Sequence, residues 1–355
     1  MTGTSLDGLD MAAVRIEGEG LDMRCEVIGF ESAPLGDLSG PLRALASGVA
    51  MPAFEIAELA LRFGELHAQT ALVLKRAVGG CDLCCAHGQT ICHKPPVSWQ
   101  LLNPWPIAKK LGCAVVTDLR GADLACDGQG APVTPIADWV LFRDADEDRL
   151  IVNLGGFCNC TLLLAGGGAD TVRGFDVCAC NQVIDAAART GIGAPYDGGG
   201  TAALNGSIDE SALADLTKAL IGQAEAGRSL GTGDEAWRWV EHWRPKLIGD
   251  DLCATAAAGV AGVIVQAIDR MELGEDSLIA MAGGGVHNAA LVQAIRSRSQ
   301  HRIETTEAIR VQPDAREAAC FAVLGALCQD GVEITLPGVT GAKSRMLSGS
   351  WINNR

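Results

Sequence analysis

The hydrophobic pattern predicts both helices and strands along the chain. Apolar residues near helical spacing predict an amphipathic helix over residues 52–78, which begins at a favoured proline position. The run 253–268 carries no charge but is shorter than a bilayer span, so we expect a buried helix there. Further helices are expected over residues 104–111, 135–142, 183–189, 234–243 and 314–327.

Short apolar runs that end at glycine or polar residues predict the strands. They cover residues 10–16, 26–32, 83–86, 113–117, 149–154, 157–164, 172–175 and 277–282. Polar residues at the carboxyl ends of strands are of special interest, because open α/β sheets place their chemistry there.

Length and composition limit the possible classes of protein. A chain of 355 residues is too long for one ordinary core, so two domains are expected. The 48% apolar and 20% charged content is that of a soluble globular protein. A net charge of −15 argues against nucleic acid as a partner, which requires a basic face. With neither a signal peptide nor a membrane segment expected, a cytoplasmic protein is predicted.

The fourteen cysteines do not follow the spacing of a metal site. Cys81 and Cys84 lack a matching second pair. The pairs at 158–160 and 178–180 have only one residue between the two cysteines, which is a poor spacing for binding one zinc ion. We therefore expect free thiols that act as small apolar side chains.

Glycine turns provide candidate phosphate sites. Gly3 and Gly8 bracket Thr4, Ser5 and Asp7, and such a turn can cradle phosphate or simply lead into the next strand. A second turn at residues 153–156 repeats this plan. Two such turns, one per domain, would hold a polyphosphate from both sides. The glycines at 283–285 would let the backbone approach a nucleotide closely, although three glycines alone are a weak signal.

Asp176 stands between a predicted strand and a predicted helix. An acid at this junction would face the crevice at the strand's carboxyl end. Aspartate is equally a favoured N-cap, so Asp176 has either a catalytic or a capping role on this evidence.

Other strand ends carry groups suited to a small polar ligand. His87, Gln89 and Thr90 follow one strand, and Arg120 follows the next. Because residues 95–96 are prolines, we expect a substrate loop rather than a core element here. Such side chains can bind the hydroxyls of a sugar-like molecule.

In their order, these motifs resemble the anhydro-N-acetylmuramic acid kinase family, a branch of the superfamily of sugar kinases, chaperone ATPases and actin. No single motif is specific, but together they span about 340 residues. They are Gly3–Gly8, His87–Thr90, Gly128–Pro132, Val152–Gly156 with Asn159, Gly174–Asp176 with Asn181, Tyr196–Asp197 with Gly199, Gly283–Gly285 with His287–Asn288, Arg316–Ala318 and Val339–Gly341.

The resemblance implies an α/β protein with two ribonuclease-H-like domains hinged around a central nucleotide and sugar cleft. The expected boundaries are residues 1–140 and 141–334, with a tail at 335–355 that packs back on the first domain. The family has a strand before the first glycine turn, so the first domain is expected to lack its opening strand. ATP and Mg²⁺ are the implied cofactors.

The resemblance also implies the reaction and its residues. The family opens 1,6-anhydro-N-acetylmuramic acid with water and phosphorylates the freed 6-oxygen, giving N-acetylmuramic acid 6-phosphate during peptidoglycan recycling. Asp176 would be the general base. No direct metal ligand is expected. Mg²⁺ would bind together with ATP, with a water molecule between the ion and Asp7. ATP would contact Thr2, Gly3, Thr4, Ser5, Leu6, Asp7, Gly8, Leu9, Asn153, Gly155, Gly156, Gly283, Gly284 and Gly285, and the sugar would contact His87, Gln89, Thr90, Arg120 and Glu317.

The chain departs from the family pattern after Asp176. The family has Asp-Thr-Gly-Pro-Gly-Asn, whereas Cys178 and Cys180 replace the two glycines here. If those glycines have positive φ, the cysteines should be strained. Cys92 also stands where an arginine is usual. A nucleotide-binding protein with weakened turnover and a kinase for another small sugar are therefore alternatives, and a homodimer is left open.

Overall fold

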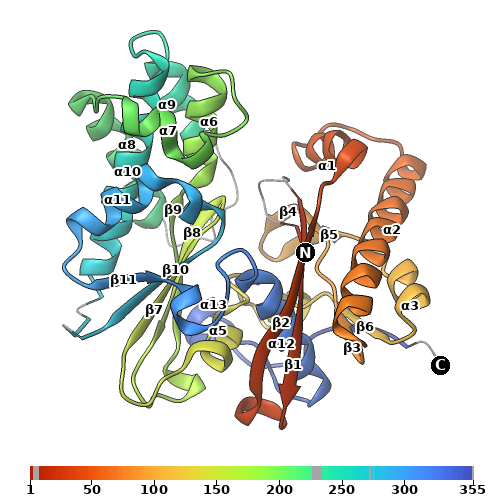
Figure 1. Cartoon of the computed structure of the whole chain (residues 1–355). Helices are drawn as coiled ribbons and strands as arrows, with labels where there is room; N and C mark the ends of the chain where they lie inside the picture. The colour runs from red at the N-terminus through yellow and green to blue at the C-terminus, as the bar shows by residue number, and fades with distance from the viewer. Residues whose placement is uncertain (3–7, 226–233, 272, 275, 354–355) are drawn as a thin grey trace. The chain divides into compact units, whose positions relative to one another are not determined.

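The computed structural model describes residues 1–2, 8–225, 234–271, 273–274 and 276–353. By their internal contacts they form two compact units (Figure 1). The first unit comprises Met1–Arg143, Gly167–Arg173 and Asp314–Arg355, and the second comprises Asp144–Gly166 and Gly174–Pro313. Strands and helices are mixed in both, so the prediction of an α/β fold is confirmed.

A five-stranded sheet is the base of the second unit, with the spatial order β11-β10-β7-β8-β9 (Figure 1). Its strands are β7 (Arg149–Leu154), β8 (Phe157–Leu163), β9 (Arg173–Ala179), β10 (Leu278–Ala282) and β11 (Arg302–Thr305). β10 is parallel to β7 and β11, and β8 is antiparallel to β7. β7, the first of these strands along the chain, thus lies in the centre of the sheet, as in a ribonuclease-H-like domain. β10 is buried throughout, which explains its uninterrupted apolar sequence.

Helices complete the second unit around α10 (Gly249–Asp269), which contacts α6, α7, α8 and α11. The others are α6 (Asn181–Gly191), α7 (Thr201–Asn205), α8 (Glu210–Glu225), α9 (Asp234–Trp243) and α11 (Ala289–Arg298). By length and composition α10 could cross a membrane, but 78% of its apolar window is buried inside the unit. The prediction of a buried helix is confirmed.

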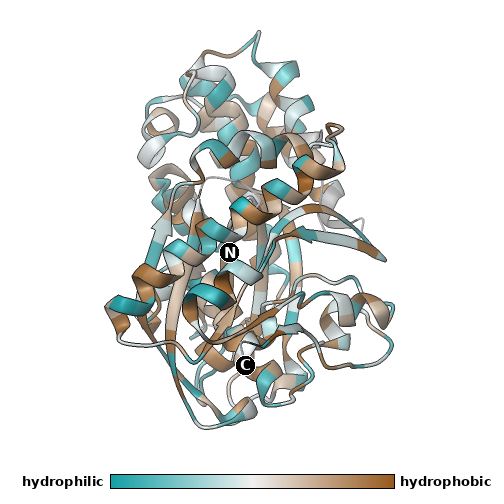
Figure 2. Ribbon diagram, turned by 90° about the vertical axis from the view of Figure 1, so that its right-hand side faces the viewer, coloured by the Kyte–Doolittle hydropathy of each residue, from teal (hydrophilic) through white to brown (hydrophobic). Residues whose placement is uncertain are grey.

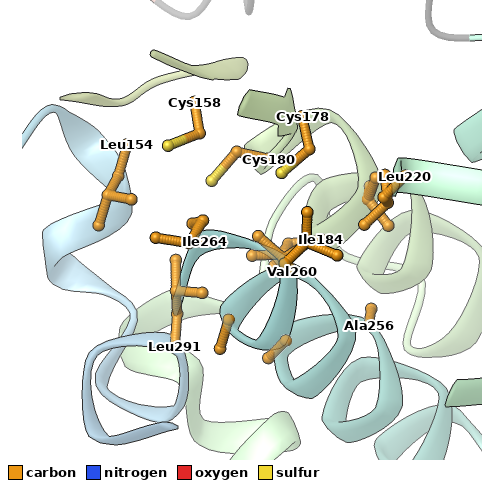
Figure 3. Close-up of a cluster of buried hydrophobic side chains, with 14 of the residues drawn as sticks. Leu154, Cys158, Cys178, Cys180, Ile184, Leu220, Ala256, Val260, Ile264 and Leu291 are labelled. Carbon is orange, nitrogen blue, oxygen red and sulfur yellow. The ribbon is translucent and has the colours of Figure 1, made fainter. Parts of the chain in front are cut away.

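Four cysteines from the neighbouring strands β8 and β9, and from the residue after β9, lie in this core. Figure 3 shows Cys158, Cys178 and Cys180 among its side chains. Cys158, Cys160, Cys178 and Cys180 are at most 1% exposed. Burial raises the pKa of the Cys180 thiol to about 12, so it packs as a neutral side chain. Neither Cys178 nor Cys180 has a positive φ, so the expected backbone strain is wrong. The sulfur atoms fill space between the sheet and α10 instead.

The first unit contains three smaller sheets. Its strands are β1 (Leu9–Glu17), β2 (Arg24–Ala33), β3 (Leu83–Cys85), β4 (Gln89–Lys94), β5 (Val97–Leu101), β6 (Ala114–Thr117) and β12 (Ser350–Ile352). β1 pairs antiparallel with β2, and β6 lies between β3, which is parallel, and β12, which is antiparallel. The described residues before β1 form no strand corresponding to the central β7 of the second unit. A substrate loop is expected around Pro95 and Pro96, but these residues form the turn of the β4–β5 hairpin. The loop expectation is corrected because the strands on both sides of the turn pair antiparallel.

Four helices of the first unit lie where the sequence predicts them, over residues 52–78, 104–111, 135–142 and 314–327. The helices of this unit are α1 (Ser39–Ala46), α2 (Ala53–Val78), α3 (Trp105–Leu111), α4 (Gly121–Ala125), α5 (Pro135–Phe142), α12 (Arg316–Gln329) and α13 (Pro337–Thr340). Apolar and polar residues alternate along many of the helical ribbons in Figure 2, as expected for helices with one buried face. The helix predicted over residues 52–78 is confirmed as α2.

α12 belongs to the first unit because it packs on α5, β1 and β3. The predicted boundary, in contrast, places residues up to 334 in the second domain. At the start of α12, the guanidinium of Arg316 donates hydrogen bonds to both carboxylate oxygens of Asp138, and it also contacts Thr134 Oγ1 at 3.3 Å. Arg316 and Asp138 are at most 1% exposed. This buried ion pair connects α12 with α5.

We predict that Cys178→Gly lowers the free energy of unfolding by about 2 kcal/mol, because it empties a packed position in the core. Cys92→Gly, at an exposed position of β4, is the matched control for the added backbone freedom of a strand glycine. Urea unfolding followed by circular dichroism measures both variants. Equal losses in the two variants would contradict a packing role for Cys178.

Candidate active site

Two predicted sugar-site residues meet at the carboxyl ends of β3 and β6. His87 follows β3, Arg120 follows β6, and the parallel pairing brings both to the same edge. Arg120 Nε donates to His87 Nε2 at 3.2 Å, and Arg120 Nη1 donates to the carbonyl of Gly130 at 2.7 Å. The arginine therefore joins the β3 end to the glycine-rich loop after α4.

His87 is a buried, neutral residue, and one of its ring nitrogens has no hydrogen-bond partner among the described residues. Its ring packs on Phe321, with the centroids 4.6 Å apart. Burial, followed by the charge of Arg120, holds the pKa of His87 well below its usual range. Because Nε2 accepts from Arg120, the proton is on Nδ1. Nδ1 has no hydrogen-bond partner among the described residues, so it is a buried donor suited to a ligand oxygen.

Gln89 connects the chain's first residues to the β4–β5 hairpin. Thr2 Oγ1 donates to Gln89 Oε1 at 2.6 Å, and Gln89 Nε2 donates to the carbonyl of Thr90 at 3.2 Å. Thr2 and Gln89 are both buried. The side chain of Leu9 lies fully in the core.

The predicted phosphate turn is only partly described. Gly8 is half-buried next to β2. The predicted contacts at Gly3, Thr4, Ser5, Leu6 and Asp7 lie outside the described residues.

Glu317 is the second residue of α12 and lies half-buried near Arg120. Burial raises the pKa of its carboxyl above the usual 4.5, while the charges of Arg316 and Arg120 lower it. The net shift is upward, so a carboxylate at this position is costly for the fold. Such a perturbed acid near the arginine that bonds His87 marks a candidate functional site.

Sequence reasoning missed Asp123, the residue that anchors the glycine-rich loop. It is buried and accepts hydrogen bonds from the Gly130 amide and from Thr340 Oγ1, both at 2.6 Å. A Cβ added to Gly128 would lie 2.2 Å from Asp123 Oδ2. Its position one helical turn after Arg120 was the available signal, but its distant partner Thr340 was not visible in the sequence.

In the second unit, Asp176 lies inside the edge strand β9 and not at a strand-to-helix junction. The strand continues to Ala179 because Val177 and Cys178 enter the core. α6 begins at Asn181, and its N-cap is Cys180, which makes no side-chain capping bond. The capping interpretation of Asp176 is therefore wrong. The carboxyl group is half-buried.

The glycine turn between β7 and β8 is attached to the start of α6. The Gly156 carbonyl accepts from the Cys180 amide at 2.9 Å, and the Gly155 carbonyl accepts from the Asn181 amide at 3.0 Å. Asn181 Nδ2 also donates to the Leu154 carbonyl at 3.0 Å. These bonds fix the turn relative to β9, the strand that carries Asp176.

Two of the three glycines after β10 are required by packing. Gly283 has φ +82°, and a Cβ there would lie 2.8 Å from Asn153 Oδ1. A Cβ on Gly285 would lie 2.6 Å from Leu154 Cβ. Both glycines contact the end of β7, and their predicted close approach to a nucleotide stays a prediction. For Gly284 the nearest described atom would be 4.0 Å away, so this position is open.

The structure thus groups the predicted residues by unit. Thr2, His87, Gln89, Arg120 and Glu317 are in the first, where Thr2 bonds Gln89 and Arg120 bonds His87. The second holds one group of strand ends and turns, formed by Asn153, Gly155, Gly156, Asp176, Gly283, Gly284 and Gly285. Among the described residues, no three His, Cys, Asp or Glu side chains form a metal site.

A ribonuclease-H-like sheet with glycine turns at its strand ends is the framework of the sugar kinases and related ATPases. The family model described as anhydro-N-acetylmuramic acid kinase matches residues 1–354. The chain therefore belongs to the anhydro-N-acetylmuramic acid kinase family, and it is a kinase with an alcohol group as acceptor.

Bacterial proteins of that name are similar to this chain over nearly their whole length. The Salinibacter ruber protein is 37% identical, and the match covers 99% of this chain and 94% of that protein. The Chromohalobacter salexigens protein is 35% identical, with 98% and 97% coverage. Among solved structures, a ROK family glucokinase from Streptomyces griseus in complex with glucose and AMPPNP has a TM-score of 0.38 at 10% identity, covering 88% of this chain and 99% of that one.

We predict opposite outcomes for two neighbouring alanine substitutions. Gly285→Ala forces a Cβ against Leu154 and should lower the free energy of unfolding by about 1–3 kcal/mol. Gly284→Ala enters open space and should change it by less than about 0.5 kcal/mol. Urea titrations of both variants test this. Equal stability of the two variants would show that the end of β10 relaxes away from β7.

The raised pKa of Glu317 predicts a pH-dependent stability. The carboxyl binds its proton more tightly in the folded state, so its contribution is complete below about pH 4.5 and is lost as pH rises through the folded pKa. Glutamine stays neutral, so Glu317→Gln should melt above wild type at pH 7, and the difference should close near pH 4. Thermal scans across this range measure it, with the exposed Glu58→Gln as the charge control. A lower melting temperature at pH 7 would contradict the expectation.

Proposed function

We propose that this protein opens the anhydro bridge of 1,6-anhydro-N-acetylmuramic acid with water and transfers the γ-phosphoryl group of ATP to the freed 6-oxygen. The product is N-acetylmuramic acid 6-phosphate, a step of peptidoglycan recycling in the cytoplasm. The observation that carries the proposal is the family match over residues 1–354, with Asp176 on β9 and Glu317 at the start of α12.

Asp176 is proposed as the general base. Its carboxylate takes a proton from a water molecule as the water attacks the anomeric carbon. The bond from that carbon to the 6-oxygen breaks, and the 6-oxygen takes the phosphoryl group instead of a proton. As the 6-oxygen bonds to the γ-phosphorus, the bond from that phosphorus to the β,γ-bridging oxygen breaks and ADP leaves. Asp176 keeps the one proton released from the water. The β7–β8 turn bonded to α6 supports the strand end beyond Asp176, which favours a positioned base.

His87, Arg120 and Glu317 are proposed to hold the sugar. The buried Nδ1–H of His87 donates to a sugar oxygen, and Arg120, already bonded to His87, fixes the orientation of the ring. Glu317 accepts a hydrogen bond from a sugar hydroxyl, which compensates its carboxylate for burial. Gln89 and Thr90 support this wall from the β4–β5 hairpin.

ATP is proposed to lie against the glycine turns. Gly284 fits this role, because it is the open position between two glycines that pack on β7. Mg²⁺ bound with ATP supplies charge neutralisation of the phosphates, and it keeps several water ligands in such sites. Gly155 and Gly156 turn their carbonyls toward α6, which leaves their amides for the phosphates.

The assay that tests the proposal combines ATP, Mg²⁺ and the anhydro sugar in ¹⁸O-labelled water. We expect ADP and a sugar phosphate with the label on the anomeric oxygen and none on phosphate, sampled within minutes. ATP binding without product would favour the weakened nucleotide-binding protein. If the protein phosphorylates another small sugar and does not act on the anhydro sugar, the result would favour a kinase for that other sugar.

We predict that Asp176→Asn lowers turnover by roughly 10²–10⁴-fold, the usual effect of removing a positioned base. Affinity for ATP, measured by calorimetry, and the melting temperature should stay near wild type. Asp170→Asn, at an exposed position outside β9, serves as the control. Turnover of Asp176→Asn within tenfold of wild type would exclude the base role.

A further inference from the structure

Cys81 and Cys113 lie side by side in the first unit, at the starts of two paired strands. Cys81 is in the loop between α2 and β3, and Cys113 directly precedes β6. The parallel pairing sets Leu83 opposite Ala114, so the residues before both strands are neighbours. This end of the strands is opposite to the one that leads to His87 and Arg120.

The two sulfur atoms are 3.8 Å apart. A disulfide needs about 2.05 Å, so a shift of less than 2 Å closes the distance, and no other element separates the pair. The Cys81 sulfur also lies 3.3 Å from the Leu83 carbonyl. Cys81 is half-buried, and Cys113 is 8% exposed, which admits only a small reagent.

The charges around the pair favour one thiolate and one thiol. The hydrogen bond between the two sulfur atoms lowers the pKa of Cys113 and raises the pKa of Cys81. The ammonium of Lys75, fixed by a 2.5 Å hydrogen bond to the Leu111 carbonyl, also favours a thiolate here. Asp82 opposes it. These effects favour the thiolate on Cys113 over a thiolate on Cys81.

The cysteines of the second unit have a different environment. Burial is the first cause that raises the pKa of the Cys178 and Cys180 thiols, and neither side chain is exposed. Reactive cysteines combine thiolate character, some access and a nearby resolving thiol. Cys113 with Cys81 meets all three conditions.

We propose that Cys113 and Cys81 form a peroxide-reactive couple that closes reversibly to a disulfide. The Cys113 thiolate attacks one oxygen of hydrogen peroxide and becomes a sulfenic acid, while the other oxygen leaves as hydroxide and takes a proton to become water. The Cys81 sulfur then attacks the sulfenic sulfur, and the hydroxyl leaves with the Cys81 proton as a second water. In total, two thiols and one peroxide give one disulfide and two waters.

The disulfide would join two residues that are 32 positions apart in the sequence, and it would link the starts of β3 and β6. Cross-linking stabilises mainly by restricting the unfolded chain. The residues proposed to hold the sugar lie at the opposite strand ends and are untouched. The disulfide therefore acts as a removable stabilising clamp on the first unit.

The experiment treats the full-length protein with a few equivalents of hydrogen peroxide, alkylates the remaining thiols and maps the peptides by mass spectrometry. We expect a Cys81–Cys113 peptide pair that lacks two hydrogens and returns to two thiols with dithiothreitol. The oxidised protein should melt about 5 °C above the reduced protein. Another linkage, or no oxidation at either residue, would overturn the proposal.

Single variants separate the two roles. In Cys81→Ser the sulfenic acid on Cys113 should persist and be trapped by dimedone, and the gain in melting temperature should vanish. In Cys113→Ser the remaining Cys81 should not react. Cys92→Ser, which removes an exposed cysteine elsewhere, should form the linkage as wild type does. Equal peroxide reactivity of Cys81→Ser and Cys113→Ser, or failure of the linkage in Cys92→Ser, would contradict the assignment.

Discussion

The buried ion pair between Arg316 and Asp138 is the interaction on which the first unit depends. Removal of one partner from such a pair leaves an uncompensated charge in the core and typically costs about 3–5 kcal/mol. Asp138 also accepts from Cys320 Sγ at 3.4 Å, so α5 is joined to the first two turns of α12. Glu317 follows Arg316 directly. Its half-buried position beside Arg120 is therefore a consequence of how Arg316 is held.

The candidate site combines groups that each oppose folding. Burial disfavours the carboxylate of Glu317 and leaves His87 neutral with an unused donor. Functional sites commonly contain such groups, because a ligand completes the hydrogen bonds that the protein omits. Asp123 has the opposite character: both its oxygens are satisfied, and it holds the Gly130 loop in place. Rigid support thus surrounds the unsatisfied residues.

The departure from the family pattern after Asp176 is absorbed by packing. Cys178 and Cys180 adopt negative φ values and join Cys158 and Cys160 in the core. Small side chains on the adjacent strand β8 leave room for the added sulfur atoms. The change therefore affects the interior of the second unit, at the end of β9, the strand that carries Asp176, without imposing the expected strain.

The sequence alone determined the elements whose pattern is local. α2 and α10 follow from apolar spacing and a charge-free run, and the strand ends bearing His87 and Arg120 follow from where apolar residues stop. The ordered motifs also indicated the family. The sequence predicts a strand that ends at residue 175, whereas β9 continues to Ala179 because Val177 and Cys178 are buried in the core. Contacts between distant residues were decided only by the tertiary structure: Asp123 with Thr340, Gly285 with Leu154, and Cys81 with Cys113. A sequence records which side chains exist, but the close approach of two strand ends depends on how the whole sheet pairs.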